Sequence, residues 1–376
     1  MTRPLAIGFA VSPTWLRGEH WRAPDSRVEE LFALTPYADL ARHAERVGVD
    51  FLFNADAGFL DPAVLDRAPG FSTLDSHTLL SALAAVTERI GLVPTVQSSF
   101  ASPFTVARQL QSLHRLSDGR AGWNVVTALG GHENHGLASL PDSPERYARA
   151  AELVAAVHAL WASYPADALL LDRERGRFAD ASRVRPAGVA GARFRAAGPL
   201  PVAAHPDGPP PLFQAGGSPS GVAFAGATAD AVFGLAATVE EAAAQRAALR
   251  RAAVEAGRAA DAVRFLPGFV FRLAAPGAPR ADAAADTGGP AHWGVDGTPA
   301  DAVAEILHRH EAGAIDGLIA LAGGGWESMR LFFDEVMPAL AAHGVLLADP
   351  AARTLRARLG LAVGPPAPDG AGGRAW

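Results

Sequence analysis

The segment from Gln214 to Ser218 has the pattern of an anion-binding turn. Its sequence, Gln-Ala-Gly-Gly-Ser, reads as a strand end, two glycines and a helix start. Glycines let the backbone approach a ligand closely, and the free amides at a helix start attract an anion, typically phosphate. Tyr147, one turn inside another expected helix, can add its hydroxyl to the same anion. The alternative is that Gly216 and Gly217 form an ordinary tight turn and that Ser218 is an ordinary helix cap.

Asn124 is a second candidate, because it lies within an apolar, strand-like run from Ala121 to Thr127. A buried amide needs partners for its oxygen and its nitrogen, and near the end of a strand a ligand often supplies one. Neighbouring backbone groups are an equally simple source of partners. His20 follows the first expected strand, where it can meet a substrate as a general acid or base, or serve only the structure of its loop.

Composition removes several kinds of chemistry. The chain of 376 residues has no cysteine, and all 33 residues in its Lys+Arg count are arginine. Thiolate nucleophiles, thiolate metal sites, Schiff-base lysines and P-loop lysines are therefore excluded. His132, Glu133 and His135 resemble metal ligands in type, but they lie on one expected loop without a third element to orient them, so we expect no metal site.

The charge balance indicates a small, compact ligand. The net charge is −6 and the isoelectric point is about 6.1, which gives no basic footprint for nucleic acid or an anionic membrane. The uncharged stretch 90–107 is interrupted by Pro94 and Pro103, so we expect no membrane span. The apolar run from Pro4 to Trp15 shows no evident cleavage site and is read as holding the first strand. We expect a cytoplasmic protein.

Pairs of a hydroxyl residue and proline mark five expected helix starts. A Ser or Thr at the N-cap satisfies one backbone amide, and Pro at the first helical position presets the helical φ. The pairs are Thr35-Pro36, Ser102-Pro103, Ser143-Pro144, Ser218-Pro219 and Thr298-Pro299. Between the helical segments lie eight apolar runs of strand length. They are Leu5 to Ala10, Phe51 to Ala55, Ile90 to Val96, Ala121 to Thr127, Pro211 to Ala215, Ala231 to Leu235, Phe265 to Phe271 and Gly317 to Leu321.

Eight alternating strands and helices predict an α/β fold, namely a (β/α)8 TIM barrel. A doubly wound open sheet is the alternative, but the count reaches eight and no G-x-G-x-x-G pattern follows the first strand. We expect one domain over residues 1–363 and a flexible tail over 364–376. An excursion over 173–210 should separate the fourth helix from the fifth strand, and 274–290 should be a loop.

In a barrel of this kind, the position of a residue along its strand or helix predicts where it lies in the fold. The carboxyl ends of its strands and the starts of the following helices share one rim, and that rim carries function. Six polar side chains should therefore meet at one mouth. They are Asp56, Thr95, Asn124, Ser143, Tyr147 and Ser218.

Four ordered motifs resemble the bacterial-luciferase-like flavin monooxygenases. They are the segments Thr78 to Leu92, Gly119 to Thr127 (Gly-Arg-Ala-Gly-Trp-Asn-Val-Val-Thr), Glu145 to Tyr147 and Gln214 to Ser218. Within that family the chain looks most similar to the branch of nitrilotriacetate monooxygenase component A, dibenzothiophene-sulfone monooxygenase and pristinamycin IIA synthase. The resemblance covers residues 5–345 with one interruption.

The resemblance implies a TIM barrel that takes reduced FMN from a separate NAD(P)H-dependent flavin reductase and uses dioxygen to oxygenate an organic substrate. We also expect a homo-oligomer, either a dimer or a tetramer. Asp56, Thr95, Tyr147 and Ser218 match the family's flavin-contacting positions, and we expect Asn124, Ser143 and Gly217 to bind the cofactor with them. Of these, Tyr147 and Ser218 are implied to face the phosphate. Thr95 and Asn124 match the pair implied to hold dioxygen beside the flavin, and with His20 they form the expected catalytic set.

The chain departs from the family pattern at three places. Ser143 stands where the family usually has a histidine one turn before Tyr147, and the loop 128–136 is shortened. The long family insert between the seventh strand and the seventh helix is replaced by the short segment 274–290. A deazaflavin-dependent oxidoreductase of the same fold and a non-catalytic flavin-binding protein therefore stay open as alternatives.

Overall fold

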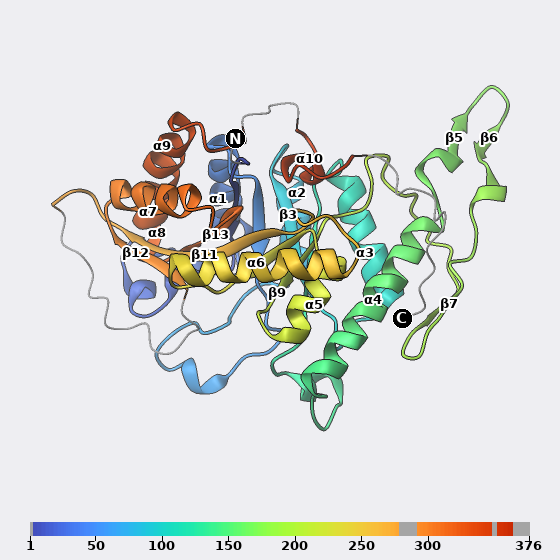
Figure 1. Ribbon diagram of the computed structural model, residues 1–376, viewed down its shortest axis with the longest axis horizontal. Helices are drawn as coiled ribbons and strands as arrows, with labels where there is room; N and C mark the ends of the chain where they lie inside the picture. Colours follow the sequence, from blue (N-terminus) through green and yellow to red (C-terminus); the bar gives the residue numbers. More distant parts are fainter. Residues whose placement is uncertain (1–2, 278–291, 348–351, 364–376) are drawn as a thin grey trace.

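Eight parallel strands form a closed barrel. The computed structural model describes residues 3–277, 292–347 and 352–363 (Figure 1). Its main sheet has the order β10-β9-β4-β3-β2-β1-β13-β11, and β10 also pairs with β11, which closes the ring. The strands are β1 (Ala6–Ala10), β2 (Phe51–Asn54), β3 (Gly91–Gln97), β4 (Trp123–Val126), β9 (Leu212–Ala215), β10 (Ala231–Gly234), β11 (Arg264–Leu273) and β13 (Gly317–Ala322). The predicted (β/α)8 barrel is confirmed.

A ninth strand, β12 (Trp293–Gly297), was not among the eight expected from the sequence. It pairs in parallel with the second half of β11, while the first half of β11 pairs with β10. The two halves of one long strand thus have different neighbours. β12 was missed because two glycines and an aspartate in five residues give it little intrinsic preference for a strand.

Helices surround the barrel. They are α1 (Leu34–Arg46), α2 (Ser76–Ala84), α3 (Pro103–Leu116), α4 (Ser143–Ala162), α5 (Pro219–Thr228), α6 (Val239–Glu255), α7 (Pro299–Glu311), α8 (Gly325–Leu331), α9 (Met337–Ala342) and α10 (Leu355–Arg358). A π-helical segment, Phe332–Val336, joins α8 to α9. The loops contain short 3-10 helices at 14–16, 20–22, 28–30, 62–64, 132–135, 166–168 and 181–183.

Three of the five predicted N-cap positions are confirmed, at Ser102, Ser218 and Thr298. The side chains of Ser218 and Thr298 each accept from a backbone amide, whereas that of Ser102 makes no capping hydrogen bond. Two are wrong. α1 begins at Leu34, so that Thr35-Pro36 falls inside its first turn, where proline is tolerated because the amides there have no helical acceptor. The cap of α4 is Asp142, whose carboxylate accepts a hydrogen bond from the Glu145 amide over 3.0 Å. An aspartate caps a helix as well as a serine does.

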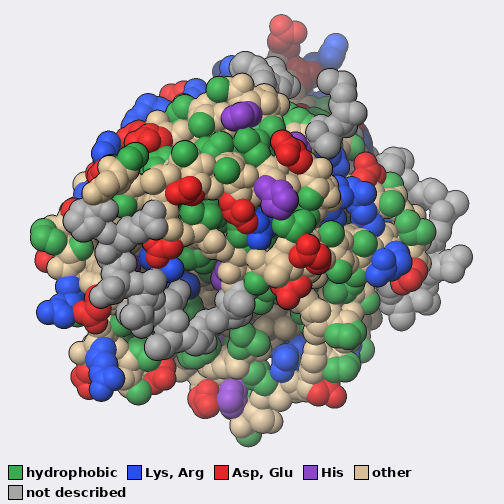
Figure 2. Space-filling view, turned by 60° about the vertical axis from the view of Figure 1, so that its left-hand side comes forward, with side chains coloured by type: hydrophobic (Ala, Val, Ile, Leu, Met, Phe, Trp, Pro, Cys, Tyr) green, Lys and Arg blue, Asp and Glu red, His purple; other side chains and the backbone are tan. Residues whose placement is uncertain are grey.

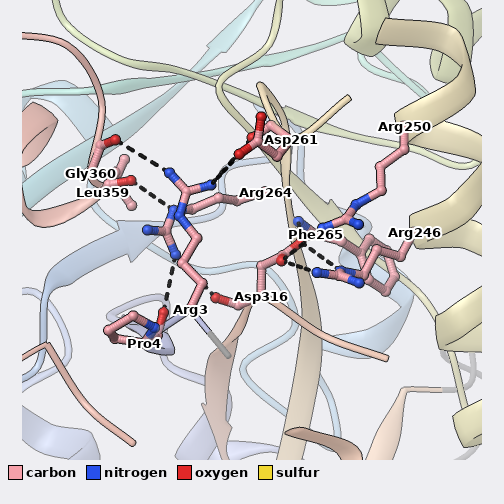
Figure 3. A network of polar contacts seen from close by, with 10 residues as sticks. All are labelled: Arg3, Pro4, Arg246, Arg250, Asp261, Arg264, Phe265, Asp316, Leu359 and Gly360. Carbon is pink, nitrogen blue, oxygen red and sulfur yellow. Dashed lines mark hydrogen bonds and ion pairs between the residues drawn. The ribbon is translucent and has the colours of Figure 1, made fainter. Parts of the chain in front are cut away.

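The amino-terminal end of the barrel is closed by α10. Leu355 and Leu359 are fully buried and pack with the inward-facing side chains of the strands. A Cβ atom on Gly91 or Gly122 would lie 2.7 or 2.9 Å from Leu355, so these two glycines provide its room. Arg264 donates to the Leu359 carbonyl over 2.7 Å, and Figure 3 shows this contact within a wider arginine network.

The excursion between α4 and β9 contains two small antiparallel hairpins that the sequence did not predict. β5 (Leu169–Asp172) pairs with β6 (Arg177–Ala179), and β7 (Val189–Ala190) pairs with β8 (Arg195–Ala196). The excursion therefore begins before the expected residue 173, and Figure 1 shows β5 and β6 standing away from the barrel.

Two expected segments lie wholly or largely outside the described residues. They are the tail over 364–376 and most of the loop over 274–290. Among the helices of the described part of the chain, none has both the length and the apolar character needed to cross a membrane.

Candidate active site

The barrel mouth lies at the carboxyl ends of the strands. In Figure 1 it is on the lower side, opposite α10 and the amino terminus. The face drawn in Figure 2 is hollowed below its centre, and acidic and basic side chains are intermixed over it. The six polar positions expected at the rim follow or end strands β2, β3, β4 and β9 or begin helices α4 and α5, so they belong to neighbouring parts of this end.

Thr95 and Asn124 are joined directly. They are register partners on β3 and β4, and the Asn124 Nδ2 atom donates to the Thr95 hydroxyl over 3.0 Å. The Thr95 hydroxyl in turn donates to the Asn54 carbonyl over 2.7 Å. Because a carbonyl can only accept, the single hydroxyl hydrogen of Thr95 is used there, and its oxygen must accept from Asn124. This chain of bonds fixes which end of the Asn124 amide faces Thr95.

The other end of the Asn124 amide has no partner. Asn124 is 2% exposed, and its Oδ1 atom has no hydrogen-bond partner in the described part of the chain. An unpartnered acceptor buried in protein costs about 1–3 kcal/mol. The side chain lies on the same face of β4 as Gly122, which faces the barrel interior. This buried oxygen therefore indicates a polar ligand at the mouth.

Asp56 organises the backbone beside that pair. It lies two residues beyond the end of β2, and its Oδ1 atom accepts from the Gly58 amide over 2.8 Å. Its Oδ2 atom accepts from the Ser76 amide at the start of α2 over 3.3 Å. The Ser76 hydroxyl accepts from the Thr95 amide over 2.9 Å. Asp56 and Ser76 thus hold the ends of β2 and β3 and the start of α2 in one arrangement.

The Gly216–Ser218 turn has the form of an anion cradle. Gly216 has φ +141°, a conformation that favours glycine, and a Cβ atom there would lie 2.8 Å from the Tyr147 hydroxyl. A Cβ atom on Gly217 would meet nothing within 4 Å, so open space lies beside it. The Ser218 hydroxyl accepts from the Gly221 amide over 3.1 Å, which leaves its hydrogen available to donate.

Tyr147 and Gln214 complete the cradle from two other elements. Tyr147, on the first turns of α4, accepts a hydrogen bond from the Gln214 Nε2 atom over 3.3 Å. Gln214 is fully buried on β9, and its Oε1 atom has no partner among the described residues. The Tyr147 hydroxyl hydrogen stays available. Ser143 is half-buried one turn earlier on α4, as its first residue rather than its cap.

His20 lies away from the Thr95–Asn124 pair, in a charged cluster on the other side of the mouth. The half-buried imidazole has its pKa lowered, first by burial and then by the positive charge of Arg272, against the opposing effects of Asp296 and Asp25. Arg272 and Asp296 are register partners on β11 and β12, with Nε and Oδ2 3.0 Å apart. A neutral imidazole at pH 7 can both donate and accept a proton.

The three metal-like residues on the loop after β4 are otherwise engaged. His132 contacts Glu133, with Nε2 and Oε1 3.3 Å apart. The His135 ring stacks on Phe100, with centroids 4.0 Å apart. Within residues 3–277, 292–347 and 352–363, no group of three or more His, Asp or Glu side chains is arranged to hold a metal ion.

Sequence reasoning missed three residues of this site. Gln214 was seen as part of a strand end, and its isolated amide in an apolar run was a usable signal. Ser76 gave a weaker signal, as a hydroxyl residue directly after Asp75, which caps α2. Arg272 gave none, because its place over the mouth depends on β11 extending beyond the ring and on β12 pairing with it.

Comparisons with known proteins identify the family of the chain. The sequence model of the luciferase-like monooxygenases matches residues 14–353. The chain is 36% identical over 281 residues to N-acetyl-S-(2-succino)cysteine monooxygenase from Bacillus subtilis (strain 168), an alignment that covers 71% of this chain and 60% of that protein. It is 34% identical over 284 residues to nitrilotriacetate monooxygenase component A from Aminobacter aminovorans, covering 72% of this chain and 63% of that protein.

A solved structure is similar over the whole barrel. EDTA monooxygenase from Chelativorans sp. BNC1 superposes with a TM-score of 0.83 and 26% identity, covering 96% of this chain and 98% of that one. The matches to the two curated relatives span only about 60% of their lengths.

Proposed function

Because the chain belongs to the luciferase-like monooxygenase family, we propose that it is a monooxygenase that binds reduced FMN at the barrel mouth and uses dioxygen to oxygenate a small organic substrate. The reduced flavin would come from a separate NAD(P)H-dependent reductase, and the protein would act as a homo-oligomer. The relatives named above are monooxygenases of small organic molecules, and this supports a small organic molecule as the substrate.

The observation that carries this proposal is the set of unsatisfied polar groups at the mouth. Within the part of the chain that the structure describes, Asn124 and Gln214 each hold a buried amide oxygen without a partner, and Gly217 opens onto free space beside the start of α5. A flavin mononucleotide has a phosphate for a helix start and a ring edge with polar atoms. The residues present therefore fit such a group at both ends.

We assign the phosphate to the cradle formed by Gly217, Ser218 and Tyr147, with Ser143 close along α4. Ser218 and Tyr147 would each donate a hydroxyl hydrogen, and the α5 amides would add their dipole. No lysine is available for the phosphate anywhere in the chain. Asp56, Thr95 and Asn124 would contact the ring portion.

Bound reduced flavin supplies the electrons that activate dioxygen. The protein's part is to orient the reactants and to exclude water. Asn124 presents a fixed carbonyl oxygen and one remaining amide hydrogen at the mouth, while Thr95 holds that amide in place. His20, neutral at pH 7 because its pKa is lowered, would give or take a proton on the substrate side.

An anaerobic titration followed by exposure to oxygen tests the proposal. The protein should bind reduced FMN, and on mixing with labelled dioxygen it should place one labelled oxygen atom in a product. A panel of thioethers, sulfones, amines and ketones, with nitrilotriacetate included, supplies the trial substrates. Failure to bind reduced FMN would contradict the proposal. Binding without any oxygenated product would favour a flavin-binding protein, and preference for a reduced deazaflavin would favour the oxidoreductase.

A further inference from the structure

We infer that Arg272 binds a carboxylate of the substrate, so that the substrate is a small organic acid held across the mouth from the Thr95–Asn124 pair. This inference rests on the proposed function. It concerns the side of the mouth opposite the proposed phosphate and oxygen positions, for which neither the comparisons nor the motifs assign a residue.

The position of Arg272 in the ring is the first observation. In the ring of eight strands, β11 is four strands from β3 in either direction, so it lies opposite Thr95. Val270 packs with the interior cluster, and Arg272, two residues further along the same strand, shares its face. The guanidinium therefore stands over the interior, above the ring, where a substrate would lie between it and Asn124.

The bonding of Arg272 is the second observation. Among the described residues, only its Nε atom has a hydrogen-bond partner, Asp296 over 3.0 Å, and its side chain is 26% exposed. The two terminal nitrogens have no hydrogen-bond partner in the described part of the chain. One edge of the planar guanidinium thus keeps it oriented, and the outer edge presents two donors. That edge matches the two oxygens of a carboxylate.

The surroundings leave Arg272 room for a ligand, and because Asp296 balances its charge, a carboxylate would be held by the two outer donors rather than by a net charge. A Cβ atom on Gly323, at the end of β13, would lie 3.0 Å from the Arg272 Cγ atom, so the glycine makes space for the side chain. Asp25, the next carboxylate, accepts from the Glu327 amide over 3.1 Å, at the start of the helix formed by α8 and its continuation. The positive end of that helix partly offsets the negative charge of Asp25. His20 is neutral at pH 7 and adds a hydrogen bond rather than a charge.

Matched acids and amides test the inference by calorimetry on the FMN-loaded, reduced protein under nitrogen. The probes are succinate with succinamide, glutarate with glutaramide, and thiodiglycolate with its diamide. At least one acid should bind tenfold or more tightly than its amide. Arg272→Gln should reduce that preference to twofold or less. Asp296→Asn should keep or increase it, because a competing carboxylate is removed.

Arg175→Gln is the matched control, since Arg175 also pairs with an aspartate but lies on the β5–β6 hairpin. It should leave the acid preference unchanged. Reduced FMN should bind to Arg272→Gln within twofold of its affinity for the unaltered protein, which shows that the variant is folded. The inference is overturned if no acid is preferred over its amide, or if the preference survives in Arg272→Gln. If the unaltered protein did not bind reduced FMN, that result would instead count against the proposed function.

Discussion

The amide nitrogen of Asn124 donates to the hydroxyl of Thr95 over 3.0 Å, between register partners on neighbouring strands. Since the Thr95 hydroxyl hydrogen is given to the Asn54 carbonyl, Thr95 has no hydrogen left for a ligand. The two residues therefore have different parts at the mouth. Thr95 positions the amide, and Asn124 presents its free oxygen and its second hydrogen.

Replacing Asn124 with Leu should slow oxygenation while leaving the fold intact. Leu keeps the volume and removes both polar ends of the amide. Loss of one positioned polar group at a reacting centre lowers rates by roughly a hundredfold or more, and we expect at least a tenfold loss of oxygenated product per flavin oxidised. Thr95→Ser keeps both hydroxyl bonds and should retain most of the activity. If Asn124→Leu and the unaltered protein formed the same amount of oxygenated product per flavin oxidised, the role assigned to Asn124 would be refuted.

Tyr147→Phe and Ser218→Ala should each weaken the binding of FMN more than that of riboflavin. Each change removes one hydroxyl donor to the proposed phosphate, and a hydrogen bond to a charged group contributes about 1.5–3 kcal/mol. We expect at least a tenfold rise in the FMN dissociation constant, measured by fluorescence quenching. Riboflavin has no phosphate, so its affinity should change by less than threefold. A parallel loss for both ligands would place the phosphate elsewhere.

Alanine substitutions at Gly216 and Gly217 should have different effects, the first mainly on stability and the second mainly on FMN affinity. Gly216 has a positive φ, and its new Cβ would lie 2.8 Å from the Tyr147 hydroxyl. Gly216→Ala should therefore lower the free energy of unfolding by about 1–3 kcal/mol. The methyl group of Gly217→Ala would enter open space, so stability should stay within about 0.5 kcal/mol. FMN affinity should nevertheless fall in Gly217→Ala, and urea denaturation with FMN titration measures both effects.

Leu355→Ala should strongly destabilise the barrel. The side chain is fully buried among inward-facing strand residues at the amino-terminal end. Removing a buried leucine from a core costs about 2–5 kcal/mol. Leu116→Ala is the control, because Leu116 ends α3 and is 80% exposed. Chemical denaturation that showed similar losses for the two variants would mean that α10 does not seal the barrel.

His114 should make the protein less stable as the pH falls. Burial lowers its pKa to about 3, with a further contribution from His205. The unfolded chain takes up a proton below its ordinary pKa of about 6.5, whereas the folded chain does so only near 3. The stabilisation is thus complete above pH 6.5 and is lost as the pH falls toward 3.

The magnitude of this loss is up to about 1.4 kcal/mol per pH unit. His114→Gln keeps a donor for the Gly208 carbonyl, which His114 contacts over 3.1 Å. Between pH 6.5 and 4.5 its free energy of unfolding should fall less steeply than that of the unaltered protein. If urea denaturation gave the same pH dependence of the free energy of unfolding for both proteins, His114 would not be the cause of the loss of stability.

The barrel could be predicted from the sequence because its signals are local and repeated. Each strand buried on both faces is a short apolar run, and the helices that begin after Ser218 and Thr298 carry their own side-chain caps. Asp142 was overlooked as a cap because Ser143-Pro144 offers an equally good local pattern. Nothing in the adjacent sequence decides between the two residues.

The candidate site could be predicted only as a list of side chains sharing one rim. The pairing of Thr95 with Asn124 depends on the register of β3 and β4, which local sequence does not encode. Arg272 lies over the mouth because β11 continues beyond the ring, where its second half pairs with β12. Such non-local pairings combine segments that are far apart in the chain, so their partners are not visible in either segment alone.

The position of α10 sets an order for folding during synthesis. Strand β1 has β13 as one of its two neighbours, with Ala6 opposite Gly317, and the amino-terminal end of the barrel is closed by Leu355 and Leu359 of the last described segment. At roughly 5–20 residues per second, a ribosome needs tens of seconds between these segments. For that time one edge of β1 and the apolar interior stay uncovered. The ring of strands can therefore close only after its last elements have emerged from the ribosome.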